Sequence, residues 1–137
     1  MTIKTVVHLN FRGNARQALA FYQSVFGGEI TLVTYRDAHA AAEPVQAEQI
    51  LWGQVISADG FQVMAYDVPP AKAWSAGEIP FYVSVRGDDA EMLTRYWTAL
   101  SADGVVIEPL GPAGFSPLYG MVKDAFGMTW VLDLQIA

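Results

Sequence analysis

The chain has no cysteine and only two histidines, His8 and His39, among its 137 residues. Without cysteine it has neither a disulfide framework nor a thiolate that could act as nucleophile or metal ligand. The two histidines lie far apart in the sequence, so the chain has no helical histidine pair with metal-ligand spacing. It also lacks the glycine-rich loops of dinucleotide-binding and Walker type, so nucleotide binding by either mechanism has no support.

Charged residues are scarce, at 16% of the chain, and the formal net charge is −6. This balance argues against a nucleic-acid partner, because phosphate binding needs clustered lysine and arginine. It favours a neutral or cationic ligand instead. No apolar run reaches the roughly 18 residues that a membrane span needs, and no signal-peptide pattern is visible. We therefore expect no membrane partner and a cytoplasmic location.

The chain is rich in apolar residues, at 53%, and it repeats one pattern. Residues 4–67 read as strand, helix and three strands, and residues 79–136 read in the same order. Even the closing hairpins are alike, with ADGFQVM at 58–64 and DAFGMTW at 124–130. A short unit used twice cannot bury its apolar face alone, so the copies must pack on each other or on a second chain.

The sequence thus predicts an α+β fold of two βαβββ modules that form curved mixed sheets. We expect one domain over residues 1–137, with module one at about 1–68, a linker at about 69–78 and module two at about 79–137. Asn14 is suited to cap the first helix, and Asp88 and Asp89 favour the start of the second through capping and the helix dipole. Three prolines and two glycines predict a loop at 109–117. The expected strands are 5–11, 29–35, 48–57, 61–67, 81–86, 105–108, 118–123 and 128–135, and the expected helices are 15–26 and 90–100.

Strand alternation gives candidate cavity residues. His8 and Asn10 share a face of the first strand, and His8 is the one catalytic candidate, because an imidazole ordinarily titrates near neutral pH. The alternative is a structural histidine held by hydrogen bonds. Asp133 is a candidate acid–base partner for His8, while Trp52 and Tyr119 could either line a pocket or pack between modules. The predicted ligand-binding residues are His8, Asn10, Trp52, Met64, Tyr66, Tyr82 and Tyr119.

Several segments carry a family resemblance: LNFRGNA at 9–15, FY at 21–22, FGGE at 26–29, YG at 119–120 and KDAFGMTW at 123–130. Together they resemble the PhnB-like branch of the vicinal oxygen chelate superfamily, which includes glyoxalase I, extradiol dioxygenases and bleomycin-binding proteins. The resemblance covers essentially the whole chain. It implies paired βαβββ modules, each a partly open barrel, and a homodimer. Both domain-swapped and side-by-side module pairing satisfy the strand pattern.

Enzymes of this superfamily typically hold a divalent metal with one histidine or glutamate from each of four strands. By resemblance, those positions fall on Val6, Met64, Pro80 and Val131, none of which offers an imidazole or a carboxylate. Shifting the alignment by two residues brings in His8 and Asp133, but the middle strands then still offer only Gln62, Tyr66, Tyr82 or Ser84. We therefore expect no metal and no cofactor.

The leading functional hypothesis is a metal-free small-molecule-binding protein of this superfamily. The alternative is an enzyme of the lyase, isomerase or dioxygenase kind, either metal-dependent or assisted by His8. The expected partners are a small-molecule ligand and a second copy of the chain. Residues 39–44 are expected to form a loop that either covers the cavity or is partly mobile.

Overall fold

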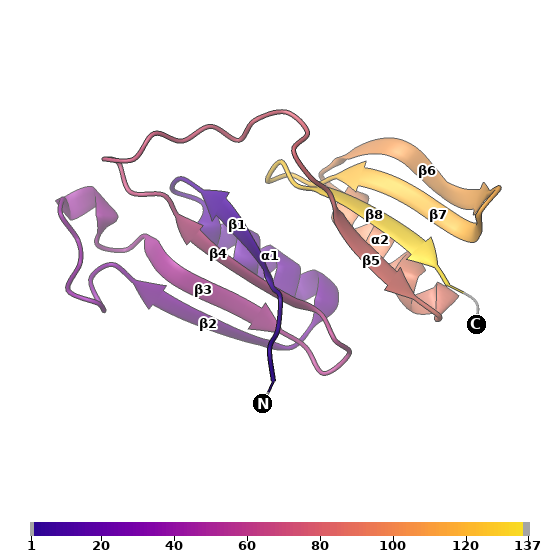
Figure 1. Cartoon of the computed structure of the whole chain (residues 1–137), viewed down its shortest axis with the longest axis horizontal. Coiled ribbons are helices and arrows are strands. Elements are labelled where there is room, and N and C mark those ends of the chain that lie inside the picture. The colour runs from indigo at the N-terminus through magenta and orange to yellow at the C-terminus, as the bar shows by residue number, and fades with distance from the viewer. Residues whose placement is uncertain (1, 136–137) are drawn as a thin grey trace. The chain divides into compact units, whose positions relative to one another are not determined.

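The chain divides into two compact units, Met1–Ala76 and Gly77–Ala137, in a computed structural model that describes residues 2–135. Each unit contains one α-helix and one four-stranded mixed sheet, with the helix on one face of the sheet (Figure 1). The boundary lies inside the segment 69–78 that was expected to connect the modules. No helix among residues 2–135 is both long and apolar enough to cross a membrane.

The first unit follows the order strand, helix, three strands. In its sheet the strands lie in the order β1-β4-β3-β2, with β1 and β4 parallel and the other pairs antiparallel. The elements are β1 (Val7–Phe11), α1 (Ala15–Phe26), β2 (Glu29–Thr34), the short 3-10 helix η1 (Pro44–Gln46), β3 (Ile50–Ile56) and β4 (Gln62–Asp67).

The second unit repeats this topology. Its strands lie in the order β5-β8-β7-β6, with β5 and β8 parallel and the other pairs antiparallel. The elements are β5 (Val83–Gly87), α2 (Ala90–Ser101), β6 (Val105–Ala113), β7 (Ser116–Lys123) and β8 (Thr129–Leu134). Each unit is therefore a βαβββ module, and the predicted fold class is confirmed.

Each helix buries one apolar stripe against its own sheet. In α1 the buried residues recur every three or four positions, which places them on one side of the helix. Beneath them lie alternate residues of the strands, such as Leu9, Val55 and Val63, all of them almost fully buried. In the second unit Leu93 and Leu100 of α2 are buried, as are Trp130 and Leu132 of β8. Because successive side chains of a strand point to opposite faces, the residues between these buried ones lie on the other face of each sheet, which its own helix does not cover.

The start of α1 is capped from a distant part of the chain. We expected Asn14 to cap this helix, but its side chain makes no capping hydrogen bond. Instead, Asp67 at the end of β4 accepts from the backbone N–H groups of Gly13 (2.7 Å) and Ala15 (3.1 Å). Its other oxygen accepts from the N–H of Ile50 at 2.9 Å. The prediction for Asn14 was wrong: the helix start is held instead by this buried carboxylate, whose negative charge is favourable at a helix N-terminus.

The same backbone region also fixes Tyr35. Its hydroxyl donates to the carbonyl oxygen of Asp67 at 2.7 Å. Burial raises the pKa of Tyr35, and the neighbouring Tyr66 and Asp67 add to the shift. In the second unit one of the two expected residues, Asp89, is confirmed as the cap, because it accepts from the N–H of Met92 at 3.1 Å.

The loop predicted at residues 109–117 is mostly strand. β6 runs through Pro109 and Pro112 to Ala113, and β7 begins at Ser116. Both prolines are tolerated because β6 is the edge strand of its sheet, where a missing N–H breaks few ladder bonds. The register between β6 and β7 also shifts at three places, which accommodates residues that cannot pair.

Arg12 ties the segment after β4 to the first unit. Its guanidinium donates to the carbonyl oxygens of Pro69, at 3.1 Å, and of Lys72. It also lies over the Trp74 ring, 5.8 Å from the ring centroid. Trp74 is thereby held by packing on an arginine.

Candidate functional site

The face of the first sheet that α1 does not cover carries most of the predicted ligand-binding residues. His8 pairs with Met64 in the β1–β4 register, Asn10 pairs with Tyr66, and Met64 also pairs with Gln54 of β3. The residues that alternate with them, such as Leu9, Val55 and Val63, are buried on the side of α1, so these side chains point to the opposite side. We use the name helix-free face of the first sheet for the part of this surface on β1, β3 and β4 that is formed by His8, Asn10, Trp52, Gln54, Gln62, Met64 and Tyr66.

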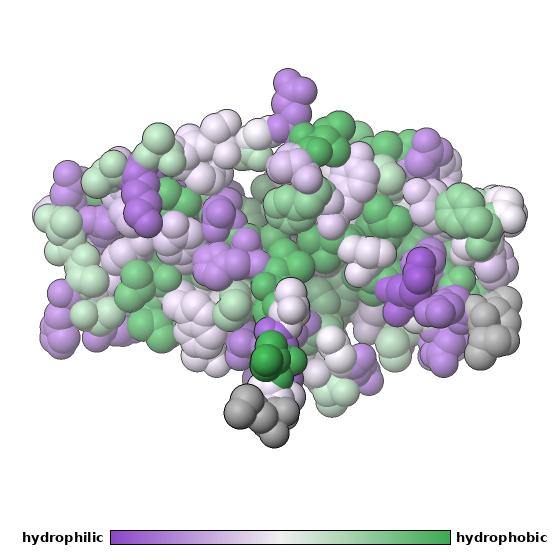
Figure 2. All heavy atoms as spheres, viewed as in Figure 1, coloured by the Kyte–Doolittle hydropathy of each residue, from purple (hydrophilic) through white to green (hydrophobic). Residues whose placement is uncertain are grey.

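None of these seven residues is buried: His8 and Asn10 are exposed and the other five are half-buried. In Figure 1 the helix lies behind the first sheet, so this face is turned toward the viewer. Figure 2, from the same direction, shows hydrophilic and hydrophobic residues interspersed over it. The face therefore offers ring surface and hydrogen-bonding groups side by side.

The imidazole of His8 is held in place by two neighbours. Nδ1 lies 3.1 Å from the side-chain oxygen Oδ1 of Asn10. The ring also meets Tyr66 edge to face, with centroids 5.1 Å apart and an interplanar angle of 71°. An amide oxygen only accepts, so this contact requires the proton on Nδ1. In the neutral ring, Nε2 is then the nitrogen that can accept a proton or a hydrogen bond from a ligand.

Two further cross-strand contacts fix the other side chains of this face. The indole N–H of Trp52 donates to Met64 Sδ at 3.2 Å. The amide of Gln62 donates to Gln54 Oε1 at 2.9 Å. Side chains that are already ordered lose less conformational entropy when a ligand binds.

The structure thus brings together five of the seven predicted ligand-binding residues: His8, Asn10, Trp52, Met64 and Tyr66. Sequence reasoning did not include Gln54 and Gln62 among the ligand-binding residues, although each lies two positions from a predicted residue, Trp52 or Met64, on the same strand. The other two predicted residues, Tyr82 and Tyr119, belong to the second unit. The role of all seven in ligand binding remains a prediction.

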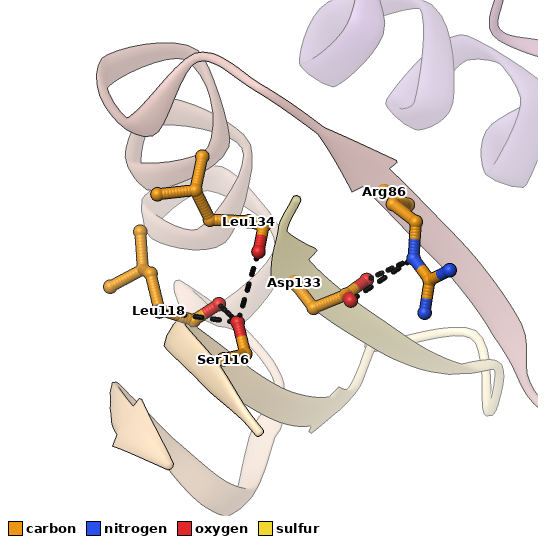
Figure 3. A network of polar contacts seen from close by, with 5 residues as sticks. All are labelled: Arg86, Ser116, Leu118, Asp133 and Leu134. Atoms are coloured by element: carbon orange, nitrogen blue, oxygen red, sulfur yellow. Dashed lines mark hydrogen bonds and ion pairs between the residues drawn. The ribbon is translucent and has the colours of Figure 1, made fainter. Parts of the chain in front are cut away.

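In the second unit, Tyr82 is exposed and immediately precedes β5. Tyr119 lies on β7 directly opposite Asp133 of β8. We considered Asp133 as a partner of His8, but its carboxylate pairs with Arg86 of the neighbouring strand β5 (Figure 3). Ser116 is drawn in the same view, where its single hydroxyl proton is shared between the carbonyl oxygens of Leu118, at 2.9 Å, and Leu134, at 3.1 Å.

The family motif around Asp124 has a structural role. Asp124 Oδ1 accepts from the backbone N–H groups of Phe126 and Met128, both at 2.9 Å. Oδ2 accepts from the indole N–H of Trp130 at 2.8 Å. Trp130 is fully buried. The motif therefore closes the β7–β8 hairpin and anchors the core, as expected for an aspartate at a tight turn.

A family profile for the glyoxalase, bleomycin resistance protein and dioxygenase proteins matches residues 5–132. The chain belongs to the Glyoxalase/Bleomycin resistance protein/Dioxygenase superfamily. This match covers both modules and agrees with the resemblance of the end motifs.

Solved structures of this superfamily's fold are similar over almost the whole chain. Protein PA1353 from Pseudomonas aeruginosa is 28% identical, with a TM-score of 0.85 and 98% of each chain covered. A putative 3-demethylubiquinone-9 3-methyltransferase, the PhnB protein from Bacillus cereus, is 24% identical, with a TM-score of 0.79 and coverage of 97% and 100%. A glyoxalase-related enzyme from Fulvimarina pelagi is 15% identical, with a TM-score of 0.57 and coverage of 97% and 89%. No curated protein matches.

The residues at the superfamily's metal positions do not fit a divalent ion. Met64 and Val131 lie on β4 and β8, as the resemblance implies, but they carry a thioether and a hydrocarbon side chain. Val6 and Pro80 precede β1 and β5 and offer no donor either. Within residues 2–135 no group of three or more histidine, aspartate or glutamate side chains is placed to hold a metal ion. Hard and borderline divalent ions need such donors.

We therefore expect the purified protein to retain only substoichiometric metal after incubation with nickel, zinc or manganese and gel filtration. Elemental analysis of the protein peak measures this directly, and a chelator-treated sample is the control. Near-stoichiometric retention of any of the three ions would contradict the assignment of Val6, Met64, Pro80 and Val131 as non-ligands.

Proposed function

We propose that this superfamily member binds a small organic molecule without a metal ion. The observation that supports this most directly is the helix-free face of the first sheet. There an imidazole, an indole and a phenol ring lie beside three side-chain amides. Binding sites for small molecules commonly combine apolar and aromatic area with a few oriented polar groups.

The chemistry of the face suits recognition better than bond breaking. Trp52 and Tyr66 supply flat apolar area, which is the main source of affinity for a ligand with rings. His8, with its ring fixed by Asn10, supplies a directed hydrogen bond that orients the ligand. Sequestration of a ligand needs neither a nucleophile nor a metal.

A second candidate is a metal-free enzyme that uses His8 as general base. The contact between His8 Nδ1 and Asn10 favours it, because an imidazole held in one tautomer can accept a proton at Nε2. The two candidates differ in turnover: a binding protein returns its ligand unchanged, whereas an enzyme converts it. Thermal-shift screening of ring-containing compounds, followed by chromatography of each hit after incubation, separates them.

Replacement of His8 by alanine is expected to weaken binding of a screening hit by roughly tenfold, the worth of one directed hydrogen bond at about 1.4 kcal/mol. The melting temperature should change little, because His8 is exposed. Calorimetric titration of wild type and variant measures the difference. The control is His39→Asn, which removes the other imidazole while asparagine accommodates the local φ of 54°. Unchanged affinity in His8→Ala would remove His8 from the site.

A further inference from the structure

The ion pair between Arg86 and Asp133 is unequal in exposure. The Asp133 side chain is 12% exposed, whereas the Arg86 side chain is 60% exposed. The carboxylate therefore lies against the sheet, and the guanidinium is largely open to solvent. Both oxygens of Asp133 accept from the same nitrogen, Arg86 Nε, at 3.3 and 3.1 Å.

This geometry leaves one edge of the guanidinium available. Within residues 2–135, the hydrogen bonds of Arg86 to Asp133 all start from Nε, and the two terminal nitrogens extend away from the carboxylate (Figure 3). A planar pair of N–H donors matches the two oxygens of a carboxylate or a phosphonate. Because Asp133 already orders the arginine, less side-chain entropy is lost when an anion binds.

An aromatic surface lies on β7, which is separated from Arg86 on β5 by the single strand β8. Arg86 pairs with Asp133 in the β5–β8 register, and Asp133 pairs with Tyr119 in the β8–β7 register. The three residues therefore form one row across three strands, and directly opposed residues in a sheet have Cβ atoms about 5 Å apart. Phe115 meets Tyr119 edge to face, with ring centroids 4.9 Å apart, and is 76% exposed.

We propose that this row is a binding site for a small aromatic acid. The terminal nitrogens of Arg86 donate to the carboxylate or phosphonate oxygens, and the ring of the ligand packs on Tyr119 and Phe115. The proposal differs from the expectation drawn from the net charge of −6, because distant charges are screened within about 8–10 Å whereas the Arg86 fork acts at contact. It involves the second unit alone, so its failure would leave the His8 face unaffected.

The test is a calorimetric or NMR titration of the full chain with benzoate and with phenylphosphonate. Benzamide, the neutral analogue of benzoate, and inorganic phosphate, which lacks the ring, are the ligand controls. We expect both aromatic anions to bind at least about tenfold more tightly than either control. Benzamide loses the charge-assisted contact with Arg86, and inorganic phosphate loses the packing of the ring. Arg86→Gln should weaken both by at least about tenfold, and Arg95→Gln, on α2, should have no effect.

The Asp133→Asn variant distinguishes anion binding by an arginine that Asp133 positions from attraction by the overall charge of the protein. Removing a negative charge should tighten anion binding if only the overall field matters. If Asp133 positions Arg86, the same change should weaken anion binding by several-fold. Because Asp133 is largely buried, the variant must first be shown to fold, by a cooperative melting transition. Arg86→Lys, at an exposed position, is a second variant that keeps the charge but loses the planar fork, and it should also weaken binding. Wild-type protein that binds neither aromatic anion, or Arg86→Gln with wild-type affinity, would overturn the proposal.

Discussion

Replacement of Gly28 by alanine is expected to destabilise the first unit by about 4 kcal/mol, through backbone strain and overpacking together. Gly28 has a φ of +98°, a conformation that residues with a Cβ rarely adopt. A Cβ at this position would also meet the carbonyl oxygen of Ile56 and would lie 2.7 Å from both the Ile56 carbonyl carbon and the Ser57 Cα. These are backbone atoms, which cannot swing aside as a side chain can.

Gly60→Ala is the matched control for Gly28→Ala. Gly60 has a φ of +101°, almost the same as Gly28, but nothing lies within 4 Å of an added Cβ. It should therefore show only the strain of the backbone, about 1–3 kcal/mol. Urea denaturation of both variants measures the difference. Equal unfolding free energies would show that the close approach of the Ile56 backbone has no energetic consequence.

Asp67→Asn is expected to destabilise the protein by about 3 kcal/mol, because one carboxylate satisfies three backbone donors. Gly13 and Ala15 donate to one oxygen and Ile50 to the other. Asparagine has the same shape, but its NH₂ group would face an N–H donor in either orientation. Asp67 is 1% exposed, so water cannot replace the lost acceptor.

Asp103→Asn is the control for this change, since Asp103 is exposed at the end of α2. It should shift the unfolding free energy by less than about 0.5 kcal/mol. Chemical denaturation followed by far-ultraviolet circular dichroism gives both values. A loss in Asp67→Asn no larger than that of the control would contradict the role of Asp67 as the cap of α1.

Much of the fold could be predicted from the sequence because its local patterns agree with one another. The apolar period of α1 and the glycines that follow it predict a helix over 15–26, and the helix has these bounds. Pro109 and Pro112 favoured a loop, but proline is tolerated on an edge strand. Pro117 lies near the start of β7, before its pairing with β8 begins at Tyr119. Whether residues 105–113 lie at an edge depends on the strand order, which the local sequence does not contain.

The candidate site was predictable in part for the same reason. Alternation along β1 and β4 placed His8, Asn10, Met64 and Tyr66 on one face, because the period of two is a local property. The partner of Asp133 was not predictable in this way. Arg86 is 47 residues away from it, and only the parallel register of β5 and β8 brings the two side chains together.

The residues that cap the two helices lie at very different distances from them along the chain. The cap of α2 comes from Asp89, directly before the helix, so this helix can be completed as soon as its own segment is formed. The cap of α1 comes from Asp67, which lies 54 and 52 residues beyond the two N–H groups that it binds at the helix start. Closing such a loop costs entropy before any contact compensates for it, and long-range contacts of this kind slow folding. During synthesis, α1 therefore stays incompletely capped until nearly the whole first unit has left the ribosome, so the N-terminal helix becomes fully formed only when its last strand is in place.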